Sequence, residues 1–334
     1  MEINTKGMRK NIQKLCNLLC ALFICCGLCG CGRQSAETVR IGSLKGPTSL
    51  GILFLMEEAK QGRTDCGYEF RMATGADELL PLLVKGELDI ALVPANVAAV
   101  LYQKTDGGVT VIDINTLGVL YLVTGSQEIA DVADLKGRTI YLTGKGATPE
   151  ASLKYILGCS GLTEDDYTLE YKSEATEVAA VLAQDSDAIG LLPQPFATAA
   201  LMQNGNLRVA LDMNEVWDSL QEEDGGTMVT GVTVVRNGFL QEHRETVEAF
   251  LEQHRDSVAA INADPEAGAA LAVEAGIVAK EEVAVQAIPR CNLVCVTGEE
   301  MRDALSAYLD VLAAFDAELV GGRVPEEDFC YSCD

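Results

Sequence analysis

The sequence predicts an α/β protein of two lobes, each a mainly parallel sheet flanked by helices, joined by a two-strand hinge. Three observations predict this fold: an internal repeat, an alternation of short apolar runs with helical patterns, and two long β-prone stretches. A chain of 334 residues is long for a single domain, and its 48% of hydrophobic residues can fill two cores.

The repeat has an offset of 99 to 100 residues. Lys45-Gly46-Pro47-Thr48 aligns with Lys145-Gly146-Ala147-Thr148, and the segment that starts at Tyr68 aligns with the one that starts at Tyr167. A difference of one residue between the two offsets is what an insertion or deletion in a loop leaves. The body of the chain is therefore expected to contain two copies of one folding unit.

Each copy has the pattern strand, helix, strand, helix, strand, which favours a parallel sheet with right-handed crossovers. The expected strands of the first copy are 39–43, 68–72 and 89–94, with helices at 49–60 and 77–86. Those of the second copy are 139–143, 168–172 and 188–193, with helices at 149–158 and 175–184.

Two long β-prone stretches, 109–125 and 228–236, follow the first and second copies and are expected to form the hinge. The remaining segments have helical patterns and are expected to pack on the first lobe. They are 239–262, 264–276 and 298–319. The expected domains are a first lobe of 39–118 with 232–334, and a second lobe of 119–231 that includes the hinge strands.

The N-terminal segment has the order of a secretory signal: four basic residues before residue 15, then an apolar run over 15–28. Leu28-Cys29-Gly30-Cys31 resembles the lipobox of bacterial lipoproteins. That resemblance implies a signal peptide at 1–30, a lipid on Cys31, and a tether at 31–38. A plain secretory signal and an N-terminal anchor helix remain alternatives.

Charge and histidine content argue against several functions. The chain has 25 Lys+Arg against 50 Asp+Glu, a formal charge of −25, whereas proteins that bind nucleic acid present a basic face. Its two histidines, His243 and His254, lie in one charged segment, which argues against histidine metal sites and Ser-His-Asp catalysis. We therefore expect no metal, no cofactor and no nucleic-acid partner.

The cysteines of the body leave three possibilities open. They can form disulfides in an exported protein, bind zinc through two loosely zinc-like spacings, or stay as thiols. The cysteines concerned are Cys66, Cys159, Cys291, Cys295, Cys330 and Cys333.

The lipobox, the repeat and the segments 86–96 (GELDIALVPAN) and 229–240 (VTGVTVVRNGFL) together resemble the solute-binding lipoproteins of ABC importers. The resemblance is to the nitrate/sulfonate/taurine/thiamine-precursor group, whose fold is of the periplasmic-binding-protein type. It implies a non-enzymatic monomer, lipid-anchored on the outer face of a bacterial cell membrane. Such a protein closes on a small polar or anionic solute by a hinge movement and docks on an ABC permease and its ATPase.

Two alternatives to this function are an enzyme of the same fold and a ligand-sensing subunit for a signalling partner. Similar folds occur in enzymes of the menaquinone route and in a thiamine-pyrimidine synthase. The absence of histidine from both copies, and the lipobox, argue against an enzyme. A sensing subunit would bind its solute in the same way but dock on another partner.

Ligands of parallel sheets bind beyond the carboxyl ends of the strands, where the repeat is best preserved. Loops that start helices there present backbone N–H groups, and short amides and hydroxyls can add hydrogen bonds. The candidate ligand-binding residues are Lys45, Gly46, Pro47, Thr48, Ser49, Thr74, Asn96, Tyr121, Gly146, Ala147, Thr148, Gln194 and Pro195.

Several candidates also have a structural interpretation. Thr74, with Asp77, Ser173 and Thr176, is a plausible helix cap, and Lys45 and Lys145 can simply be solvated. Tyr121 can pack within a hinge strand, and packing is also the favoured interpretation of Trp217.

Overall fold

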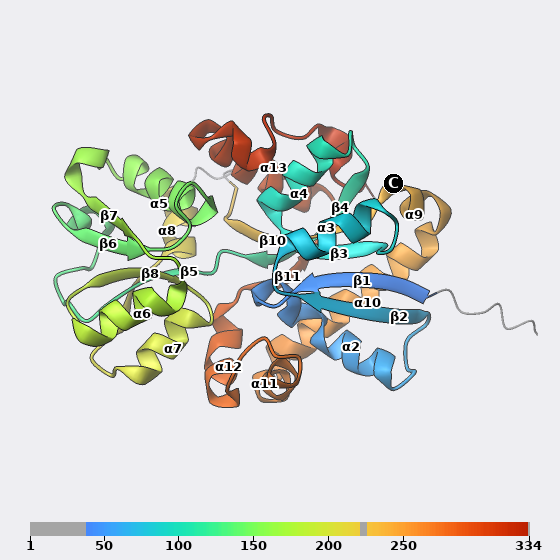
Figure 1. The fold of residues 1–334 in the computed structure, drawn as a ribbon, viewed down its shortest axis with the longest axis horizontal. Coiled ribbons are helices and arrows are strands. Elements are labelled where there is room, and N and C mark those ends of the chain that lie inside the picture. Colours follow the sequence, from blue (N-terminus) through green and yellow to red (C-terminus); the bar gives the residue numbers. More distant parts are fainter. Residues whose placement is uncertain (1–37, 221–225, 333–334) are drawn as a thin grey trace, which may run out of the picture. The chain divides into compact units, whose positions relative to one another are not determined.

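The computed structural model describes residues 38–220 and 226–332 of the protein (Figure 1). The predictions made for residues 1–37, including the lipid on Cys31, lie outside the described residues. Among the described residues, no helix is both long enough and apolar enough to cross a bilayer.

Two sheets organise the described chain. The first has the strand order β11-β4-β10-β3-β1-β2 and the second has the order β7-β6-β8-β5-β9. Strands of the first sheet are β1 (Thr38–Leu44), β2 (Gly67–Ala73), β3 (Ile90–Pro94), β4 (Val109–Leu117), β10 (Val229–Arg236) and β11 (Leu293–Val296). Those of the second are β5 (Leu120–Thr124), β6 (Thr139–Leu142), β7 (Thr168–Tyr171), β8 (Ile189–Pro193) and β9 (Arg208–Asp212).

The two copies of the repeat have the same strand order, β2-β1-β3 in the first sheet and β7-β6-β8 in the second, all paired in parallel. They also have the same register. Thr38 pairs with Gly67, and Thr139 with Thr168, 29 positions later in both copies. The common strand order predicted from the sequence is confirmed.

The strands that connect the lobes pair differently. β10 runs antiparallel to β3 and β4 in the first sheet, and β5 runs antiparallel to β8 and β9 in the second. The predicted α/β class with two helix-flanked sheets is confirmed, but each sheet is mixed rather than mainly parallel. The physical reason is that the strands that enter each lobe from the other, β5 and β10, run against the strands of the repeat that they pair with.

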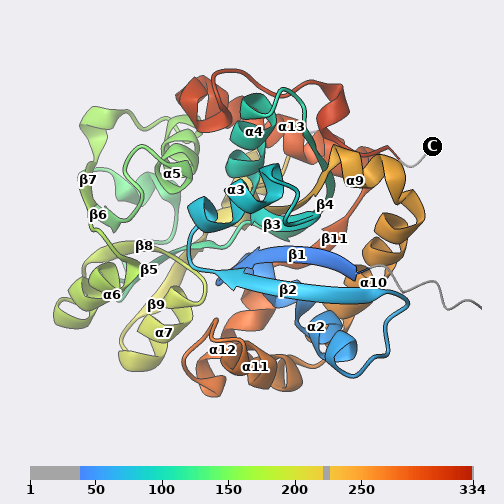
Figure 2. The ribbon, with the colours of Figure 1, turned by 45° about the vertical axis from the view of Figure 1, so that its right-hand side comes forward.

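Helices cover both faces of each sheet (Figures 1 and 2). In the second sheet, Tyr121 and Val123 pack under α6 and α7, while the alternate Leu120 and Leu122 face the core that α5 and α8 close. The helices are α2 (Leu53–Lys60), α3 (Ala76–Val84), α4 (Ala95–Lys104), α5 (Thr148–Cys159), α6 (Ala175–Gln184), α7 (Phe196–Gln203), α8 (Met213–Leu220), α9 (Asn237–Glu242), α10 (Arg244–Ala263), α11 (Pro265–Glu274), α12 (Glu281–Ala287) and α13 (Gly298–Phe315).

The C-terminal helix α13 packs on both lobes. Its Met301 and Leu305 belong to the same buried cluster as Val111 of β4 in the first sheet and Ile156 of α5 beside the second. The hydroxyl of Tyr308 in α13 lies 3.1 Å from Ser152 Oγ in α5. The sequence predicted helices that return to the first lobe, and α13 extends that packing across the boundary.

The first lobe contains a buried carboxylate, Asp89, just before β3. It accepts hydrogen bonds from the backbone N–H and Nε of Arg40, at 3.0 and 2.9 Å, and lies 2.6 Å from Arg40 Nη2 and 3.4 Å from Arg236 Nη2. Burial raises the pKa of this carboxyl, but the Arg40 hydrogen bonds outweigh burial, and the net pKa is lowered. Deprotonated Asp89 therefore stabilises the fold.

We expect Asp89→Asn to lower the free energy of unfolding at pH 7 by about 1–2 kcal/mol, because the partly exposed arginines are screened by solvent. A carboxyl with a lowered pKa in the folded state stabilises above its unfolded pKa and loses that contribution as pH falls. The difference between wild type and variant should thus shrink between about pH 5 and 3. Urea denaturation across this pH range measures the difference in free energy of unfolding, and a substitution of an exposed residue, Asp256→Asn, is the control. A difference that does not depend on pH would contradict a lowered pKa of Asp89.

Candidate functional site

A cavity of about 840 Å³ lies between α7 of the second lobe and the connection from α11 to α12 of the first. Its walls are mainly apolar, with Lys280, Glu282 and Gln203 as the charged and amide groups. Apolar wall residues include Phe196, Ala199, Met202, Ile277, Val278 and Val283. A cavity of this size and composition suits a small-molecule ligand.

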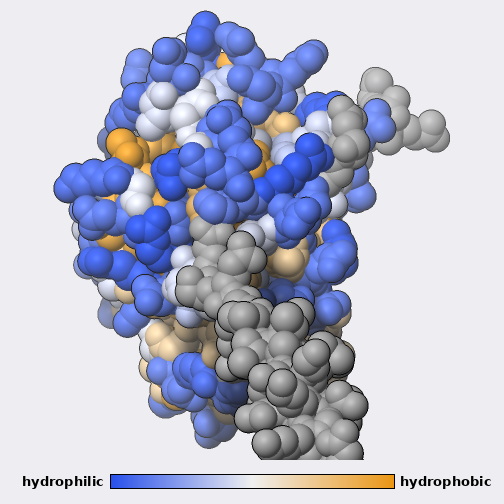
Figure 3. All heavy atoms as spheres, turned by 90° about the vertical axis from the view of Figure 1, so that its right-hand side faces the viewer, coloured by the Kyte–Doolittle hydropathy of each residue, from blue (hydrophilic) through white to orange (hydrophobic). Residues whose placement is uncertain are grey.

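Exposed apolar side chains gather at this cavity. Among the described residues, the large hydrophobic side chains that remain exposed are Val84, Phe196, Met202 and Phe315, and the second and third of these line the cavity. One other face of the molecule is mostly hydrophilic where its described residues are visible (Figure 3). The exposed Phe196 and Met202 side chains therefore form an apolar wall that a bound molecule would cover.

Loops from both copies of the repeat reach the edge of this cavity. Pro195, which follows β8, lines it directly. On the other lobe, a Cβ built on Gly276 would lie 3.4 Å from Lys45 Nζ, so the Lys45 ammonium reaches the residue next to Ile277 of the cavity wall. These two predicted site residues come from equivalent edges of the two sheets.

Gln194 is the candidate with an unused hydrogen-bond donor. Its side chain is 1% exposed, and its Oε1 accepts hydrogen bonds from the hydroxyl and the backbone N–H of Thr198, at 2.8 and 3.4 Å. Its Nε2 has no hydrogen-bond partner among the described residues. Because an unpaired buried donor costs about 1–3 kcal/mol, an acceptor on a ligand would gain from meeting it.

The loop of the first copy is mostly engaged within the protein. It precedes the 3₁₀ helix η1 (Pro47–Ile52), and the buried Ser49 hydroxyl is held by Ser43 and the carbonyl of Leu44. Thr48 is buried, and its methyl group packs so closely on Gly231 of the hinge strand β10 that a Cβ there would overlap it. Gly46 and Pro47 are half-buried, as is Asn96 in the first turn of α4.

The loop of the second copy already holds a carboxylate. Glu150, 6% exposed, accepts the N–H of Gly146 at 2.7 Å and pairs with Lys154 at 3.0 Å. Burial raises the pKa of Glu150, but these two partners outweigh it and the net pKa is lowered. The predicted anion site at Gly146 is therefore filled by the protein, while Ala147 and Thr148 are half-buried at the start of α5.

Two further candidates have structural roles. Thr74 donates its N–H and hydroxyl to Glu78 Oε1, at 3.1 and 2.8 Å, whereas the N-cap of α3 is Gly75, so the predicted capping by Thr74 itself is wrong. Lys145 stacks over the Tyr171 ring, with Nζ 5.3 Å from the ring centroid. Neither observation places these side chains at the cavity.

Tyr121 connects the lobes. It is 4% exposed on β5, and its hydroxyl donates to the carbonyl of Arg290, in the first lobe, at 2.7 Å. Burial, followed by the neighbouring Asp212, raises the pKa of Tyr121, so the hydroxyl keeps its proton. The hinge-packing interpretation of Tyr121 describes this arrangement, and a direct ligand contact would have to replace it.

Sequence reasoning missed the residues that hold the hinge between β4 and β5. Asn292 has a left-handed φ of 46°, and its carbonyl accepts the Leu117 N–H at 3.1 Å while its amide donates to the Gly118 carbonyl at 2.6 Å. The Gly118 N–H donates to Asn214 at 3.1 Å. A single asparagine before a short strand, Asn292, and one in the first turn of a helix, Asn214, gave no signal that could have identified them.

Comparisons with known proteins agree with this architecture. A family model described as NMT1/THI5 like matches residues 107–268. The structure of an ABC transporter from Parabacteroides distasonis is similar, with a TM-score of 0.74 and 25% identity over 89% of this chain and 99% of that chain. The structure of the periplasmic aliphatic sulphonate binding protein SsuA from Escherichia coli is also similar, with a TM-score of 0.67 and 16% identity over 90% of this chain and 94% of that chain.

The chain has a periplasmic-binding-protein-like fold. The family match and these structures confirm the predicted resemblance to the nitrate/sulfonate/taurine/thiamine-precursor group. The same fold is found in the desulfurization enzyme DszB, with a TM-score of 0.63 and 14% identity over 89% of this chain and 97% of that one. No curated protein sequence matches the chain. The binding-protein fold thus supports a binding role, and its cavity defines where to look for the ligand.

Proposed function

We propose that this protein is an extracytoplasmic, lipid-anchored monomer that binds a small polar or anionic solute and delivers it to an ABC permease and its ATPase. The observation that carries the proposal is the cavity between α7 of one lobe and α11–α12 of the other, in a binding-protein fold. A solute held by both lobes favours the closed arrangement, and a permease can distinguish closed from open.

The chemistry of the cavity suggests a solute with an apolar part and a polar or anionic group. Phe196, Met202 and Ile277 offer an apolar wall. Lys280 on the wall and Lys45 at its edge offer positive charge in a chain whose formal charge is −25. Gln194 Nε2 adds a buried donor beside the wall residue Pro195. We therefore propose Lys45, Gln194 and Pro195 as the ligand-binding residues among the earlier candidates.

The alternative function is an enzyme of the same fold, which the similarity to the desulfurization enzyme DszB supports. The described residues of the cavity wall include no cysteine, histidine, serine or threonine, so the wall lacks thiol, imidazole and hydroxyl groups, and its ionisable side chains are Lys280 and Glu282. This composition favours binding over catalysis. A sensing subunit shares the same cavity and differs only in its docking partner.

A thermal-shift screen of the exported protein tests the proposed binding role. The panel holds aliphatic sulfonates, taurine, nitrate and pyrimidines, each at several concentrations. A solute at 100 times its Kd should add about 2.7 kcal/mol to the free energy of unfolding, which is a clear rise in Tm. Recovery of the solute unchanged after incubation supports a receptor, whereas its conversion would establish the enzyme and overturn the proposal.

The lipid anchor is tested separately. We expect Cys31→Ser to abolish labelling by a radioactive fatty acid and to leave an uncleaved precursor, because the thiol of Cys31 is the proposed acceptor. Cys29→Ser, two residues earlier, is the matched control and should still be labelled. Fatty-acid incorporation that persists in Cys31→Ser would refute the assignment.

A further inference from the structure

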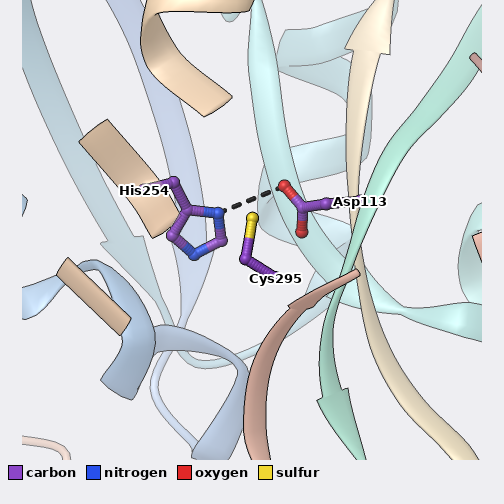
Figure 4. Close-up of side chains that lie close together, drawn as sticks. All are labelled: Asp113, His254 and Cys295. Carbon is purple, nitrogen blue, oxygen red and sulfur yellow. Dashed lines mark hydrogen bonds and ion pairs between the residues drawn. The ribbon is translucent and has the colours of Figure 1, made fainter. Parts of the chain in front are cut away.

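Three residues that are far apart in the sequence meet in the first lobe. Asp113 lies on β4, His254 on α10 and Cys295 on β11, and their potential ligand atoms all lie within 4.8 Å of one another (Figure 4). Asp113 and His254 are fully buried, and Cys295 is half-buried on the edge strand of the sheet. None of the three lines the solute cavity described above.

The carboxylate and the thiol lie on the same side of the imidazole ring (Figure 4). Asp113 Oδ2 lies 3.1 Å from His254 Nδ1, and Figure 4 shows the Cys295 sulfur on the same side of the imidazole ring. In a nucleophile triad, the thiol and the carboxylate use opposite nitrogens of the histidine, so that a proton can pass through the ring. A carboxylate and a thiol on one side of the ring, with ligand atoms within 4.8 Å of one another, are instead arranged as ligands around a common centre.

Neighbouring groups hold two of these ligands in place. Asp113 Oδ1 accepts the Thr233 hydroxyl at 2.9 Å, and Thr233 in turn accepts the Asn115 amide at 3.2 Å, so Oδ2 is left for His254. The His254 ring stacks on Phe250, with centroids 5.5 Å apart. Its Nε2 has no hydrogen-bond partner among the described residues, so Nδ1 makes the polar contact of the ring. The hydrogen bond to Asp113 is an outer-shell contact of the kind that orients a ligating carboxylate, and the Phe250 stack fixes the plane of the His254 ring.

We propose that Asp113, His254 and Cys295 bind one Zn²⁺ ion. A carboxylate oxygen, an imidazole nitrogen and a thiolate sulfur are ligands that zinc accepts together, and water can complete a tetrahedral set. Metal–ligand lengths of about 2.0–2.3 Å place ligand atoms roughly 3.3–3.7 Å apart. The cluster therefore needs to contract by no more than about 1.5 Å, judged from those lengths.

Binding moves two protons. Burial, followed by the nearby Asp113 carboxylate, raises the pKa of the Cys295 thiol to about 12, so the free thiol is protonated at neutral pH. When the S–Zn bond forms, that proton leaves to water; when the N–Zn bond forms, the proton on Nδ1 moves to Nε2. One proton is released for each ion bound, and no group is oxidised or reduced.

The site lies beside the hinge. Asp113 is four residues before Leu117, the last residue of β4, and Cys295 follows Asn292, which bonds both Leu117 and Gly118. An ion bound by β4, β11 and α10 would tie together the elements that hold the first-lobe end of the hinge. The site is separate from the solute cavity, so its failure would leave the proposed transport function untouched.

Cobalt titration of the full chain tests the proposal, because a cobalt–thiolate bond has a charge-transfer absorption in the near ultraviolet. We expect one more equivalent of thiolate-bound Co²⁺ in the wild type than in Cys295→Ser, and displacement of that band by Zn²⁺. The N-terminal cysteines are common to both proteins and cancel in the difference. Cys330→Ser, which removes another half-buried thiol of the same lobe, should match the wild type. Asp113→Asn should weaken Co²⁺ binding at least about 10-fold.

Alkylation gives a readout that needs no variant. In the wild type, Zn²⁺ should protect Cys295 from iodoacetamide, mapped by mass spectrometry, while the exposed Cys159 reacts at the same rate with and without the ion. Circular dichroism in EDTA checks that Cys295→Ser folds. Equal cobalt spectra for the wild type and a folded Cys295→Ser, or equal alkylation of Cys295 with and without Zn²⁺, would overturn the proposed site.

Discussion

Trp217→Ala should lower the free energy of unfolding by about 3–5 kcal/mol, the range for removing a large buried aromatic side chain. Trp217 is 1% exposed on α8, and its ring packs on Tyr155 at 4.5 Å and on Tyr308 at 5.5 Å between centroids. Its Nε1 also donates to the Gly226 carbonyl at 2.7 Å. Because Tyr308 belongs to α13, the cavity left by the substitution weakens the core that the two lobes share.

Urea denaturation followed by circular dichroism measures this loss, since the chain has a single tryptophan and the variant has no tryptophan fluorescence to follow. Trp217→Phe is the matched control: it keeps an aromatic ring, loses the bond to Gly226, and should cost less than Trp217→Ala. A loss below about 1 kcal/mol for Trp217→Ala, typical of a surface substitution, would contradict the shared core.

Gln194→Ala should weaken solute binding about 5- to 150-fold, which corresponds to roughly 1–3 kcal/mol for a buried hydrogen bond. The physical reason is that the buried Nε2 of Gln194 has no hydrogen-bond partner among the described residues. The backbone of Gln194 is fixed beside the hinge, because its N–H donates to the Val119 carbonyl at 3.0 Å. Calorimetry with the solute that gives the largest thermal shift measures the affinity.

Thr198→Val separates a ligand contact from a structural effect. It removes the 2.8 Å hydrogen bond to Gln194 Oε1 but leaves Nε2 in place. We expect Thr198→Val to bind the solute within a few-fold of the wild type. An affinity that is unchanged in Gln194→Ala, or equally reduced in both variants, would remove Gln194 from the site.

Much of the fold could be predicted because the same pattern of strands and helices occurs in both copies of the repeat. Ile41 pairs with Ile90, and Ile140 with Ile189, 49 positions later in each copy. A duplicated pattern of apolar strands and amphipathic helices therefore fixes the same strand order in both lobes. The strand β11 was missed, because four residues between helical patterns carry too little periodicity to distinguish them from a loop.

The site was less predictable, since its residues are brought together by tertiary structure. The repeat identified the loops at Lys45 and Pro195, but the apolar wall comes from α7 and from the α11–α12 connection, outside the matching loops. The sequence predicts that the backbone N–H groups at a helix start are available to an anion. In the structure, the Gly146 N–H instead donates to the carboxylate of Glu150, four positions later.

The same limit applies to the proposed metal site. His254 appeared isolated because its partners are 141 positions before it and 41 positions after it, on strands of a sheet that the helix covers. Spacing within the sequence grouped Cys295 with Cys291 instead, whose thiol is buried and donates to the Ala287 carbonyl at 3.2 Å. Only the packing of α10 against β4 and β11 brings together a carboxylate, an imidazole and a thiol.

Closure of the two lobes on a solute can be measured by small-angle X-ray scattering. The exported protein is measured without solute and at a saturating concentration of the solute found by thermal shift, with Gln194→Ala at the same concentration as control. The proposed function predicts a smaller radius of gyration for the wild type with solute, and an unchanged one for the variant. A radius of gyration that stays the same in the wild type, while calorimetry shows the solute bound, would contradict the closing hinge.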